Sequence, residues 1–477
     1  MINFIPQSKE KNVGIHKKSF FAVNLVSFVL AYSIQRMKIP VSVIFDIGKT
    51  NKKHFIFDEN QVILEEFSTA FEDVSDNDGY HGEDLDKLVN WLKSSLKSIV
   101  HNPKYEVRAV NFSAYGASFV HVDATGKPVA PLYNYLKSFP YDYRRAFFEK
   151  YGSVNDFCTA TASPDLGMLN SGLQLFWLKN KFPTVHESIA FSLHLPQFCS
   201  AVFTQKYFSE KTSIGCHTAL WNFKQDSYHQ WLSDENLLSK QAPIVAAEHH
   251  ETAVFEGQTI QFGAGIHDSS AALVPYLQAN KEAFILLSTG TWCISFNPFN
   301  KEPLTTEQLS KDALCYLTYE GKPVKAARLF SGNEHERQTK HLGSHFGKDE
   351  HYFKTIKFDK LLVRSLRERF KQAIPANTDI GLLQDCPFVE RNLNAFKSYE
   401  EAYHQFILDL IAQQVASLRL VIGKQPIKTI FVEGGFASNE VFTALLSEAL
   451  PMMDVRQTSL GQASALGAAL LTKSAFK

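Results

Sequence analysis

The sequence predicts an α/β protein of two related domains that face each other across a central cleft. Three observations support this prediction: the length of 477 residues, the alternation of strand-like and helix-like segments, and a Gly-centred polar turn between apolar strands in each half. A chain of this length is too long for one compact core. Because both halves repeat the same pattern, one domain per half is the simplest arrangement.

In the N-terminal half, short apolar runs alternate with helical patterns. Residues 41–45 and 55–57 are predicted strands, and residues 107–118 form a strand that runs into a small-residue turn. Residues 173–183 predict a short helix that Pro183 ends. A longer helix is predicted before residue 100, because its apolar residues recur every three or four positions. These residues are Leu85, Leu88, Val89, Leu92, Leu96 and Ile99.

The C-terminal half begins with the same strand–turn–strand pattern, at residues 282–298. An apolar-striped helix is predicted over residues 402–423, and a strand, a Gly-Gly turn and a helix over residues 427–451. A helix of small residues follows at 461–474. The two halves therefore resemble each other in layout.

Composition narrows the class of partner. Lys plus Arg and Asp plus Glu balance at 49 each, so no overall charge attracts nucleic acid or an anionic membrane, and we expect neither as a partner. The six cysteines are scattered without a CxxC pair, which disfavours a disulfide framework or a zinc site. A reducing compartment fits this usage, so we expect a cytoplasmic protein.

The first residues differ from the rest of the chain. An apolar run at Ser19–Ser33 follows two lysines and resembles a secretory signal or a short anchor. It is short for a membrane-spanning helix, and residues 31–33 make a poor cleavage site. We expect residues 1–38 to lie outside the fold, with Met37 as an alternative start immediately before the first strand.

The first Gly-centred turn contains Gly48-Lys49-Thr50, which looks like the tail of a nucleotide-binding P-loop. A P-loop needs a glycine at position 43, where the chain has Val43, and a helix after the turn, where the chain is strand-like. A P-loop is therefore excluded. A plain β-hairpin turn remains one interpretation.

The content of this turn also suits a phosphate loop. Gly48 lets the backbone approach a ligand, Thr50 and Asn51 are short donors, and Lys53 is a cation. Asp46, at the end of the preceding strand, is placed to hold Mg²⁺ through water. The second turn, Ser288-Thr-Gly-Thr-Trp, offers Gly290 and Thr291 in the same way. Two such turns, one per domain, can clamp a polyphosphate.

Two further motifs carry candidate chemistry. Asp268, beside His267, stands where a helix begins, either as a mere N-cap or as a carboxylate that accepts a proton from a substrate hydroxyl. Gly434 and Gly435 join a strand to a helix, either as an ordinary tight turn or as a place where adenine, ribose or phosphate approaches the backbone. His267 alone is usually a core or supporting histidine.

A histidine-rich segment at residues 332–352 does not carry a zinc-protease HExxH motif. We expect it to be a solvated loop or the surface of a helix.

The order of these motifs resembles the FGGY carbohydrate kinases of the sugar kinase/hexokinase–actin superfamily, over about residues 40–472. Within that family the chain is most similar to the rhamnulokinases. Their His-Asp pair is matched by His267-Asp268, their Asn-Glu stretch by Asn333-Glu334, and their Thr/Ser-rich turn by residues 210–223. Lys49 departs from the family, which usually has Thr, Ser or Ala there.

The resemblance implies two RNase H-like domains around the cleft: an N-terminal sugar-binding domain at 39–276 and a C-terminal ATP-binding domain at 277–477. It also implies ATP and Mg²⁺ as cofactors, a sugar substrate, and a homodimer. The implied roles are Asp268 as catalytic base, Asp46 as the metal-associated acid, Gly48, Lys49, Thr50, Asn51, Lys53, Gly290, Thr291, Gly434 and Gly435 on ATP, and Ala114, Tyr115, Gly116, His267 and Asn333 on the sugar.

The expected activity is ATP-dependent phosphorylation of a ketose, L-rhamnulose or a related deoxy-ketohexose. One alternative keeps the kinase chemistry but changes the substrate to L-fuculose, xylulose or a polyol. Another is a non-catalytic sugar- or nucleotide-binding sensor on the same fold, against which the presence of both Asp46 and Asp268 argues.

Overall fold

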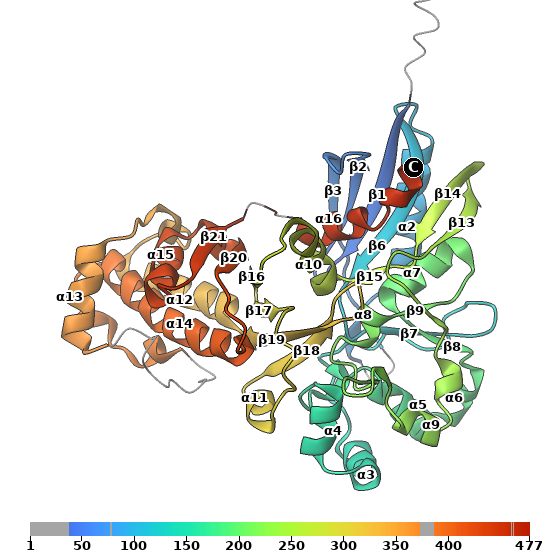
Figure 1. The fold of residues 1–477 in the computed structure, drawn as a ribbon, viewed down its shortest axis with the longest axis horizontal. Coiled ribbons are helices and arrows are strands. Elements are labelled where there is room, and N and C mark those ends of the chain that lie inside the picture. Colours follow the sequence, from blue (N-terminus) through green and yellow to red (C-terminus); the bar gives the residue numbers. More distant parts are fainter. Residues whose placement is uncertain (1–37, 77–78, 373–385, 459, 461) are drawn as a thin grey trace, which may run out of the picture.

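The computed structural model describes residues 38–76, 79–372, 386–458, 460 and 462–477. Residues 1–37 of the predicted N-terminal extension, which include its apolar run and Met37, lie outside the described residues. The described chain forms two lobes (Figure 1), each built on its own large sheet. This confirms the predicted two-domain α/β fold.

The first sheet contains seven strands in the described part of the chain, and its centre is formed by β6 and β1. β1 pairs in parallel with β6 and antiparallel with β2, so the predicted hairpin around Gly48 is confirmed. The strand order is β13 (His250–Phe255), β14 (Gln258–Gly263), β6 (Tyr105–Ala114), β1 (Ile39–Ile47), β2 (Asn51–Asp58) and β3 (Ile63–Ala70), with β15 (Ile266–His267) pairing with β6.

Helices cover both faces of this sheet, which explains why β1 is apolar almost throughout. Val43 and Phe45 pack with α2 (Leu85–Val100) and α7 (Leu195–Thr204), whereas Ile44 packs with helices α10 and α16 on the opposite face. The helix predicted before residue 100 is confirmed as α2, whose side chains Leu88, Leu92 and Leu96 are buried.

The second sheet repeats this design, with six strands in the part that the structure describes. β16 pairs antiparallel with β17 and in parallel with β20, so the second Gly-centred turn also joins two neighbouring strands. The order is β18 (Ala313–Leu317), β19 (Pro323–Leu329), β17 (Cys293–Asn297), β16 (Phe284–Thr289), β20 (Thr429–Gly434) and β21 (Asp454–Gln457).

One long helix fills the core of the second lobe. α14 (Tyr399–Val421) is buried around nearly its whole circumference. Such burial is expected for a helix whose side chains on every side are either apolar or in contact with polar partners. It contacts the helices around it and strands β17 and β19 of the sheet. Its helical neighbours are α12 (Ser331–Phe346), α13 (Lys360–Phe370) and α15 (Glu440–Ala449).

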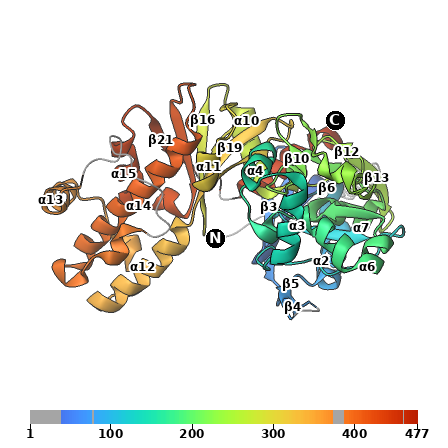
Figure 2. The same ribbon diagram turned by 90° about the horizontal axis from the view of Figure 1, so that it is seen from below.

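A pair of helices joins the lobes. α10 (Asp268–Ala279) leaves the first sheet and packs against the second through Leu273 and Tyr276. α16 (Ala463–Leu470), near the end of the sequence, packs against α10 and against β1 and β6 of the first lobe; Figures 1 and 2 show this return. The predicted boundary between residues 276 and 277 falls inside α10.

Smaller elements extend the first lobe between the sheet strands. They include the pair β7 (Phe119–Val122) and β8 (Phe191–His194) and a helical group. The helices are α3 (Tyr141–Tyr151), α4 (Val154–Thr161), α5 (Leu173–Lys181), α6 (Pro183–Ser188), α8 (Lys211–Ile214) and α9 (Trp231–Asp234).

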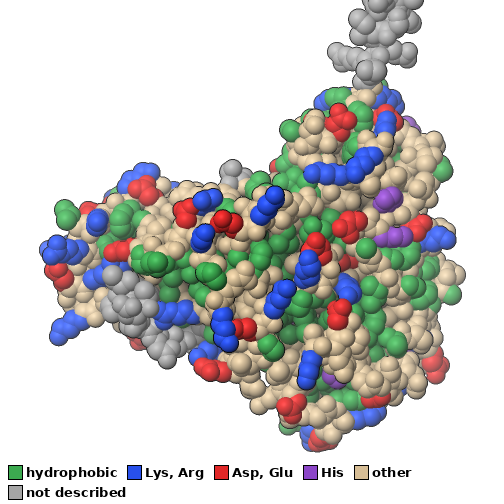
Figure 3. Space-filling view, viewed as in Figure 1, with side chains coloured by type: hydrophobic (Ala, Val, Ile, Leu, Met, Phe, Trp, Pro, Cys, Tyr) green, Lys and Arg blue, Asp and Glu red, His purple; other side chains and the backbone are tan. Residues whose placement is uncertain are grey.

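Charged side chains of both signs are interspersed on the face in Figure 3, without an extended patch of one sign. None of the helices among the described residues is long and apolar enough to cross a membrane.

Candidate active site

Parallel pairing brings the two predicted acids to one edge of the first sheet. Ile47 of β1 lies beside Ala114 of β6, which in turn lies beside His267 of β15. Asp46 is the residue before Ile47, and Asp268 is the residue after His267. The sequence-predicted Asp46, Ala114 and Asp268 therefore meet at the carboxyl ends of three neighbouring strands.

Asp268 begins α10, and its carboxylate faces a cavity. Its Oδ1 atom accepts hydrogen bonds from the backbone N–H of Ser269 at 2.5 Å and from the Ser269 hydroxyl at 3.1 Å. Although 31% of the side chain is exposed, desolvation raises the pKa of Asp268 to about 6, against the hydrogen bonds from Ser269. Near neutral pH the group is ionised but readily takes up a proton.

Asp46 is held by the far end of the chain. Its Oδ2 atom accepts a hydrogen bond of 2.9 Å from Ser464 of α16. Burial, followed by the negative charge of Asp268, raises the pKa of Asp46 to about 6. The negative charge of Asp268 therefore acts on Asp46 across the carboxyl edge of the sheet.

His267 supports the acid beside it. Its Nε2 atom lies 3.1 Å from Asp268 Oδ1 and 3.1 Å from Cys216 Sγ, and its ring stacks on Tyr316 with centroids 5.4 Å apart. The His267 backbone N–H donates to Thr212 Oγ1 at 3.0 Å. Burial lowers the pKa of His267 to about 3, so the ring is neutral at physiological pH.

A cavity of about 200 Å³ opens in front of Asp268 and is shared by both lobes. Tyr115 and Gly116, predicted to bind sugar, line it together with His267. Gly116 has no room for a side chain, because a Cβ atom would lie 2.4 Å from Cys216 Sγ. The remaining lining residues are Ala117, Tyr135, Leu136, Leu169, His217, Ser269, Trp292, Ile294, Tyr316 and Arg328.

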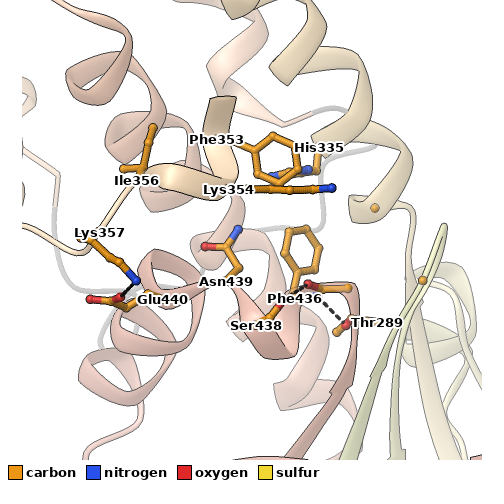
Figure 4. A pocket seen from close by; sticks show the side chains of 13 residues that line it. Thr289, His335, Phe353, Lys354, Ile356, Lys357, Phe436, Ser438, Asn439 and Glu440 are labelled. Carbon is orange, nitrogen blue, oxygen red and sulfur yellow. Dashed lines mark hydrogen bonds and ion pairs between the residues drawn. The ribbon is translucent and has the colours of Figure 1, made fainter. Parts of the chain in front are cut away.

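A larger cavity of about 550 Å³ lies in the second lobe. Figure 4 shows Phe353 and Lys354 of η3 (Tyr352–Thr355) on one side, and Phe436 of η7 (Gly435–Ser438) with Asn439 on the other. Aromatic rings beside amide and lysine groups suit a nucleotide. The other lining residues are Thr289, Gly290, Gly332, His335, Ile356, Lys357, Gly435, Ser438 and Glu440.

The second Gly-centred turn contributes residues to the linings of both cavities. Gly290 lines the larger cavity and Trp292, two residues later, lines the smaller one. Thr289 lies in register with Gly434 of β20, and its hydroxyl accepts a hydrogen bond of 2.9 Å from the Phe436 N–H. The turn at residues 290–292 therefore borders both cavities.

Gly434 is required by the backbone at this junction. Its φ is +82°, and a Cβ atom would lie 2.0 Å from the Thr289 carbonyl oxygen. Gly435, by contrast, has open space around its Cα, because the nearest atom to a Cβ would be 3.9 Å away. The sequence-predicted pair thus divides into a structural glycine and a cavity-lining glycine.

The first turn has the predicted hairpin geometry, closed by a hydrogen bond of 2.9 Å from Gly48 N–H to Asn51 O. Lys53 forms an ion pair of 2.9 Å with Glu66, and Lys49 lies 3.7 Å from Asp73. Residues 48–53 line neither of the two cavities described above. Phosphate binding by these residues stays a prediction. It would require the two lobes to approach each other.

Asn333 lies apart from the sugar-side cavity. It is exposed near the start of α12, and its backbone N–H donates to the Thr291 carbonyl at 3.1 Å. This hydrogen bond ties Asn333 to the second turn, and neither Asn333 nor Thr291 lines either cavity.

Two features were missed by the sequence reasoning. The segment expected to be solvated is helix α12, but its His335 is buried, lines the larger cavity, and contacts the Tyr403 hydroxyl at 2.9 Å. Lys52 and Glu83 form a buried ion pair of 2.9 Å, and the Tyr115 hydroxyl donates to Glu83 at 3.3 Å. Neither feature lies in a recognisable motif, since both depend on long-range contacts.

Among the described residues, no group of three or more His, Cys, Asp or Glu side chains is arranged to hold a metal ion. In phosphoryl-transfer sites Mg²⁺ is usually bound through one or two carboxylates, water and the substrate phosphates. The carboxylate of Asp46, at the sheet edge and beside Asp268, fits such a limited donor set.

Comparisons with known proteins define the class. Residues 41–272 match the model described as FGGY family of carbohydrate kinases, N-terminal domain, and residues 281–477 match carbohydrate kinase FGGY, C-terminal domain. A search of curated protein sequences found no significant match. The fold and both family models define a two-domain carbohydrate kinase.

Solved structures share this fold across nearly the whole chain. A carbohydrate kinase from Novosphingobium aromaticivorans has a TM-score of 0.75 and 23% identity, covering 92% of each chain. A ligand-bound xylulose kinase from Lactobacillus acidophilus has a TM-score of 0.71 and 14% identity, and Plasmodium falciparum glycerol kinase with ADP has 0.71 and 15%. Each of these two alignments covers 92% of this chain and 90% of the other.

The chain belongs to the FGGY family of carbohydrate kinases. It is accordingly a phosphotransferase that uses ATP and a sugar or polyol as substrates. The FGGY resemblance inferred from the motif order is confirmed, and the closer similarity to rhamnulokinases stays a prediction.

Proposed function

We propose that this protein transfers the γ-phosphoryl group of ATP to a hydroxyl of a neutral ketose, L-rhamnulose or a related deoxy-ketohexose. The observation that supports this most directly is that the turn at residues 290–292 borders both cavities, with Asp268 in the smaller one. The sugar binds in front of Asp268, mainly on the first lobe, and ATP binds in the larger cavity of the second lobe.

The smaller cavity suits a neutral deoxy sugar. Leu136, Leu169 and Ile294 supply apolar surface on which a methyl group can pack. Arg328 also lines this cavity, but Asp312 accepts a hydrogen bond of 2.7 Å from its guanidinium and offsets its charge. A carboxylate-bearing sugar would therefore gain little electrostatic attraction from Arg328.

Asp268 acts as the general base in this mechanism. The substrate hydroxyl oxygen attacks the γ-phosphorus, the bond to the ADP oxygen breaks, and the hydroxyl proton passes to Asp268 Oδ. His267 and Ser269 hold the carboxylate in place. The neutral imidazole of His267 adds no positive charge that would lower the basicity of Asp268.

Asp46 is the residue that would hold the Mg²⁺ carried by ATP. When bound, this ion would neutralise part of the phosphate charge. The Ser464 hydroxyl orients the Asp46 carboxylate. The backbone of the two Gly-centred turns binds the phosphates as the lobes close, which also excludes water and limits ATP hydrolysis.

Asp268→Asn tests the assignment of the base. The substitution removes the proton acceptor but keeps the shape, so we expect sugar phosphorylation to fall by about 10²–10⁴-fold. ATP binding, measured by calorimetry, should change little because Asp268 does not line the larger cavity. A variant that phosphorylates sugar at a comparable rate would show that another group accepts the proton.

The substrate is tested by coupled ADP release over a panel of L-rhamnulose, L-fuculose, D-xylulose, glycerol and gluconate. We expect the highest kcat/KM with L-rhamnulose or another deoxy-ketohexose. A clear preference for xylulose, glycerol or gluconate would overturn the substrate proposal while leaving the kinase chemistry intact. The homodimer and the cytoplasmic location stay predictions, which light scattering and cell fractionation can test.

A further inference from the structure

Arg328 is a charged side chain in the sugar-side cavity that the motif analysis did not identify. It belongs to β19, in the second lobe, whereas Asp268, His267 and Tyr115 come from segments leaving the first sheet. It lies beside Ile294 in the β17–β19 register, and Ile294 also lines the cavity. The second lobe therefore contributes a cation to a cavity otherwise assigned to the first.

Asp312 holds this guanidinium in a defined orientation. Arg328 Nη2 donates to Asp312 Oδ1 at 2.7 Å, and Nε donates to Oδ2 at 3.1 Å. The backbone N–H of Arg328 also donates to the Asp312 carbonyl, at 3.2 Å. Only 11% of the Arg328 side chain is exposed. A bidentate pair of this kind restricts the planar guanidinium far more than a single contact would.

Asp312 adopts a backbone conformation that is uncommon for a residue with a side chain. Its φ is +61°, in the left-handed region, in the turn between α11 (Thr306–Ser310) and β18. Such a conformation costs free energy and persists where surrounding contacts enforce it, often at ligand sites. Here it places both the carboxylate and the carbonyl of Asp312 against Arg328.

Trp292 completes the group. Its ring lies 5.3 Å from Arg328 Cζ, and 42% of Trp292 is exposed. Trp292 and Arg328 both line the cavity that contains Asp268. The indole therefore covers one side of the guanidinium while the cavity borders another, as in a ligand-binding arginine supported by an aromatic ring.

The hydrogen-bonding capacity of Arg328 exceeds what Asp312 uses. A guanidinium has five N–H donors and no acceptor. Asp312 accepts from two of them, on Nε and Nη2, which leaves N–H groups that can donate to a ligand. Oxygens of a polyhydroxy sugar are suitable acceptors for a fork of donors at fixed spacing.

We propose that Arg328 is a sugar-binding residue through which the second lobe holds the ketose, by donating hydrogen bonds to sugar oxygens other than the one that is phosphorylated. Asp312 is its positioning residue. The inference deepens the proposed function and rests on it. It implies that productive sugar binding involves both lobes, so the sugar itself helps to bring them together.

The first experiment compares Arg328→Lys with the wild-type enzyme. Lysine keeps the charge but cannot reproduce a bidentate fork, so we expect the KM of the sugar to rise about 10- to 100-fold, with the KM of ATP within about twofold. Arg391→Lys is the matched control, because Arg391 pairs with Asp409 at 2.8 Å in the same lobe but lines neither cavity. It should leave the KM of the sugar unchanged.

The second experiment uses sugars that lack single hydroxyl groups. If Arg328 donates a hydrogen bond to a given sugar oxygen, a sugar that lacks this oxygen should bind the wild type more weakly. The same sugar should bind Arg328→Lys almost as well as the complete sugar does. A purely structural role for Arg328 would instead lower activity on all analogues by the same factor. Asp312→Asn should give a smaller change in the same direction, and it serves if Arg328→Lys fails to fold.

The outcomes separate this inference from the proposed function. Suppose that the wild type phosphorylates a ketose, and that each deoxy analogue lowers activity by the same factor in the wild type and in Arg328→Lys. Arg328 then does not bind the sugar, although the kinase assignment stands. If the wild type phosphorylates no ketose on the panel, the proposed substrate class fails first. If the loss of one sugar oxygen lowers activity in the wild type but not in Arg328→Lys, the result would support both the Arg328 inference and the proposed function.

Discussion

At the residue scale, the fold raises the pKa of Asp268, the proposed base. The same desolvation that raises its pKa to about 6 also makes its ionised form costly for the folded protein. Asp46 has a similarly raised pKa, in part because of the charge of Asp268. Two carboxylates with raised pKa values at one sheet edge are typical of a functional site.

Asp268→Asn should therefore stabilise the folded protein at neutral pH. The unfolded acid ionises near 3.8 and the folded acid near 6, so the wild type loses stability as pH rises through this window, whereas the asparagine variant does not. Allowing for partial exposure, we expect a gain of about 1–2 kcal/mol at pH 7.5. Denaturant unfolding at pH 7.5 and pH 4 measures it.

The gain should be much smaller near pH 4, where the carboxyl group is protonated in the folded state and only about half ionised in the unfolded state. Asp142→Asn is the control, because the Asp142 side chain is 83% exposed. It should change the unfolding free energy little at either pH. An equal gain from Asp268→Asn at both pH values would contradict the electrostatic explanation.

At the element scale, short turns rather than whole helices determine the site. The β20–η7 turn can approach Thr289 only because Gly434 has no side chain and adopts a positive φ. The β16–β17 turn borders both cavities because it is short, with Gly290 and Trp292 two positions apart. Strand and helix packing brings these turns together, and their glycines allow close contact.

Gly434→Ala and Gly435→Ala should separate folding from binding at this turn. Gly434→Ala introduces a Cβ atom 2.0 Å from the Thr289 carbonyl oxygen at φ +82°, so we expect a loss of at least about 2 kcal/mol of stability. Gly435→Ala meets no atom closer than 3.9 Å and should leave the melting temperature nearly unchanged. Thermal unfolding and the KM of ATP report the two effects.

For Gly435→Ala we expect a raised KM of ATP, because the new methyl group enters the larger cavity that Gly435 lines. Equal melting temperatures for the two variants would mean that the turn adapts to the Gly434 side chain. An unchanged KM in Gly435→Ala would place the nucleotide away from this turn.

At the scale of the whole molecule, the lobes are joined by helices that are distant in sequence. α10 packs on α16, and Ser464 of α16 hydrogen-bonds Asp46 at the edge of the first sheet. The close packing depends on Gly467, where a Cβ atom would lie 1.9 Å from the Ala271 carbonyl oxygen. The end of the chain thus positions an acid near its beginning.

Gly467→Val should disturb both the connection and the site. The added side chain must push α16 away from α10, so we expect a loss of about 2–4 kcal/mol of stability. The displacement also moves Ser464 from Asp46, and kcat should fall more than the KM of the sugar rises. Lys473→Ala, at an exposed position beyond α16, is the control and should alter neither quantity. Unchanged stability in Gly467→Val would show that the helices tolerate separation.

The sequence alone determined the class of fold and the chemistry of its main motifs. Apolar periodicity predicted β1, β2 and α2, because local spacing decides which side of an element is buried. Two acids and two Gly-centred turns could be singled out because the roles predicted for them require particular residue types at particular strand ends. These signals are local, so they survive without knowledge of the fold.

Only the tertiary structure decided which distant residues share a cavity. It placed Arg328 and His335 in the linings of the two cavities, buried the Lys52–Glu83 pair behind Tyr115, and joined Ser464 to Asp46. A lone arginine, histidine or serine carries no spacing signal. Its neighbours depend on how strands pair and helices pack over hundreds of residues, and this information appears only when the chain is folded.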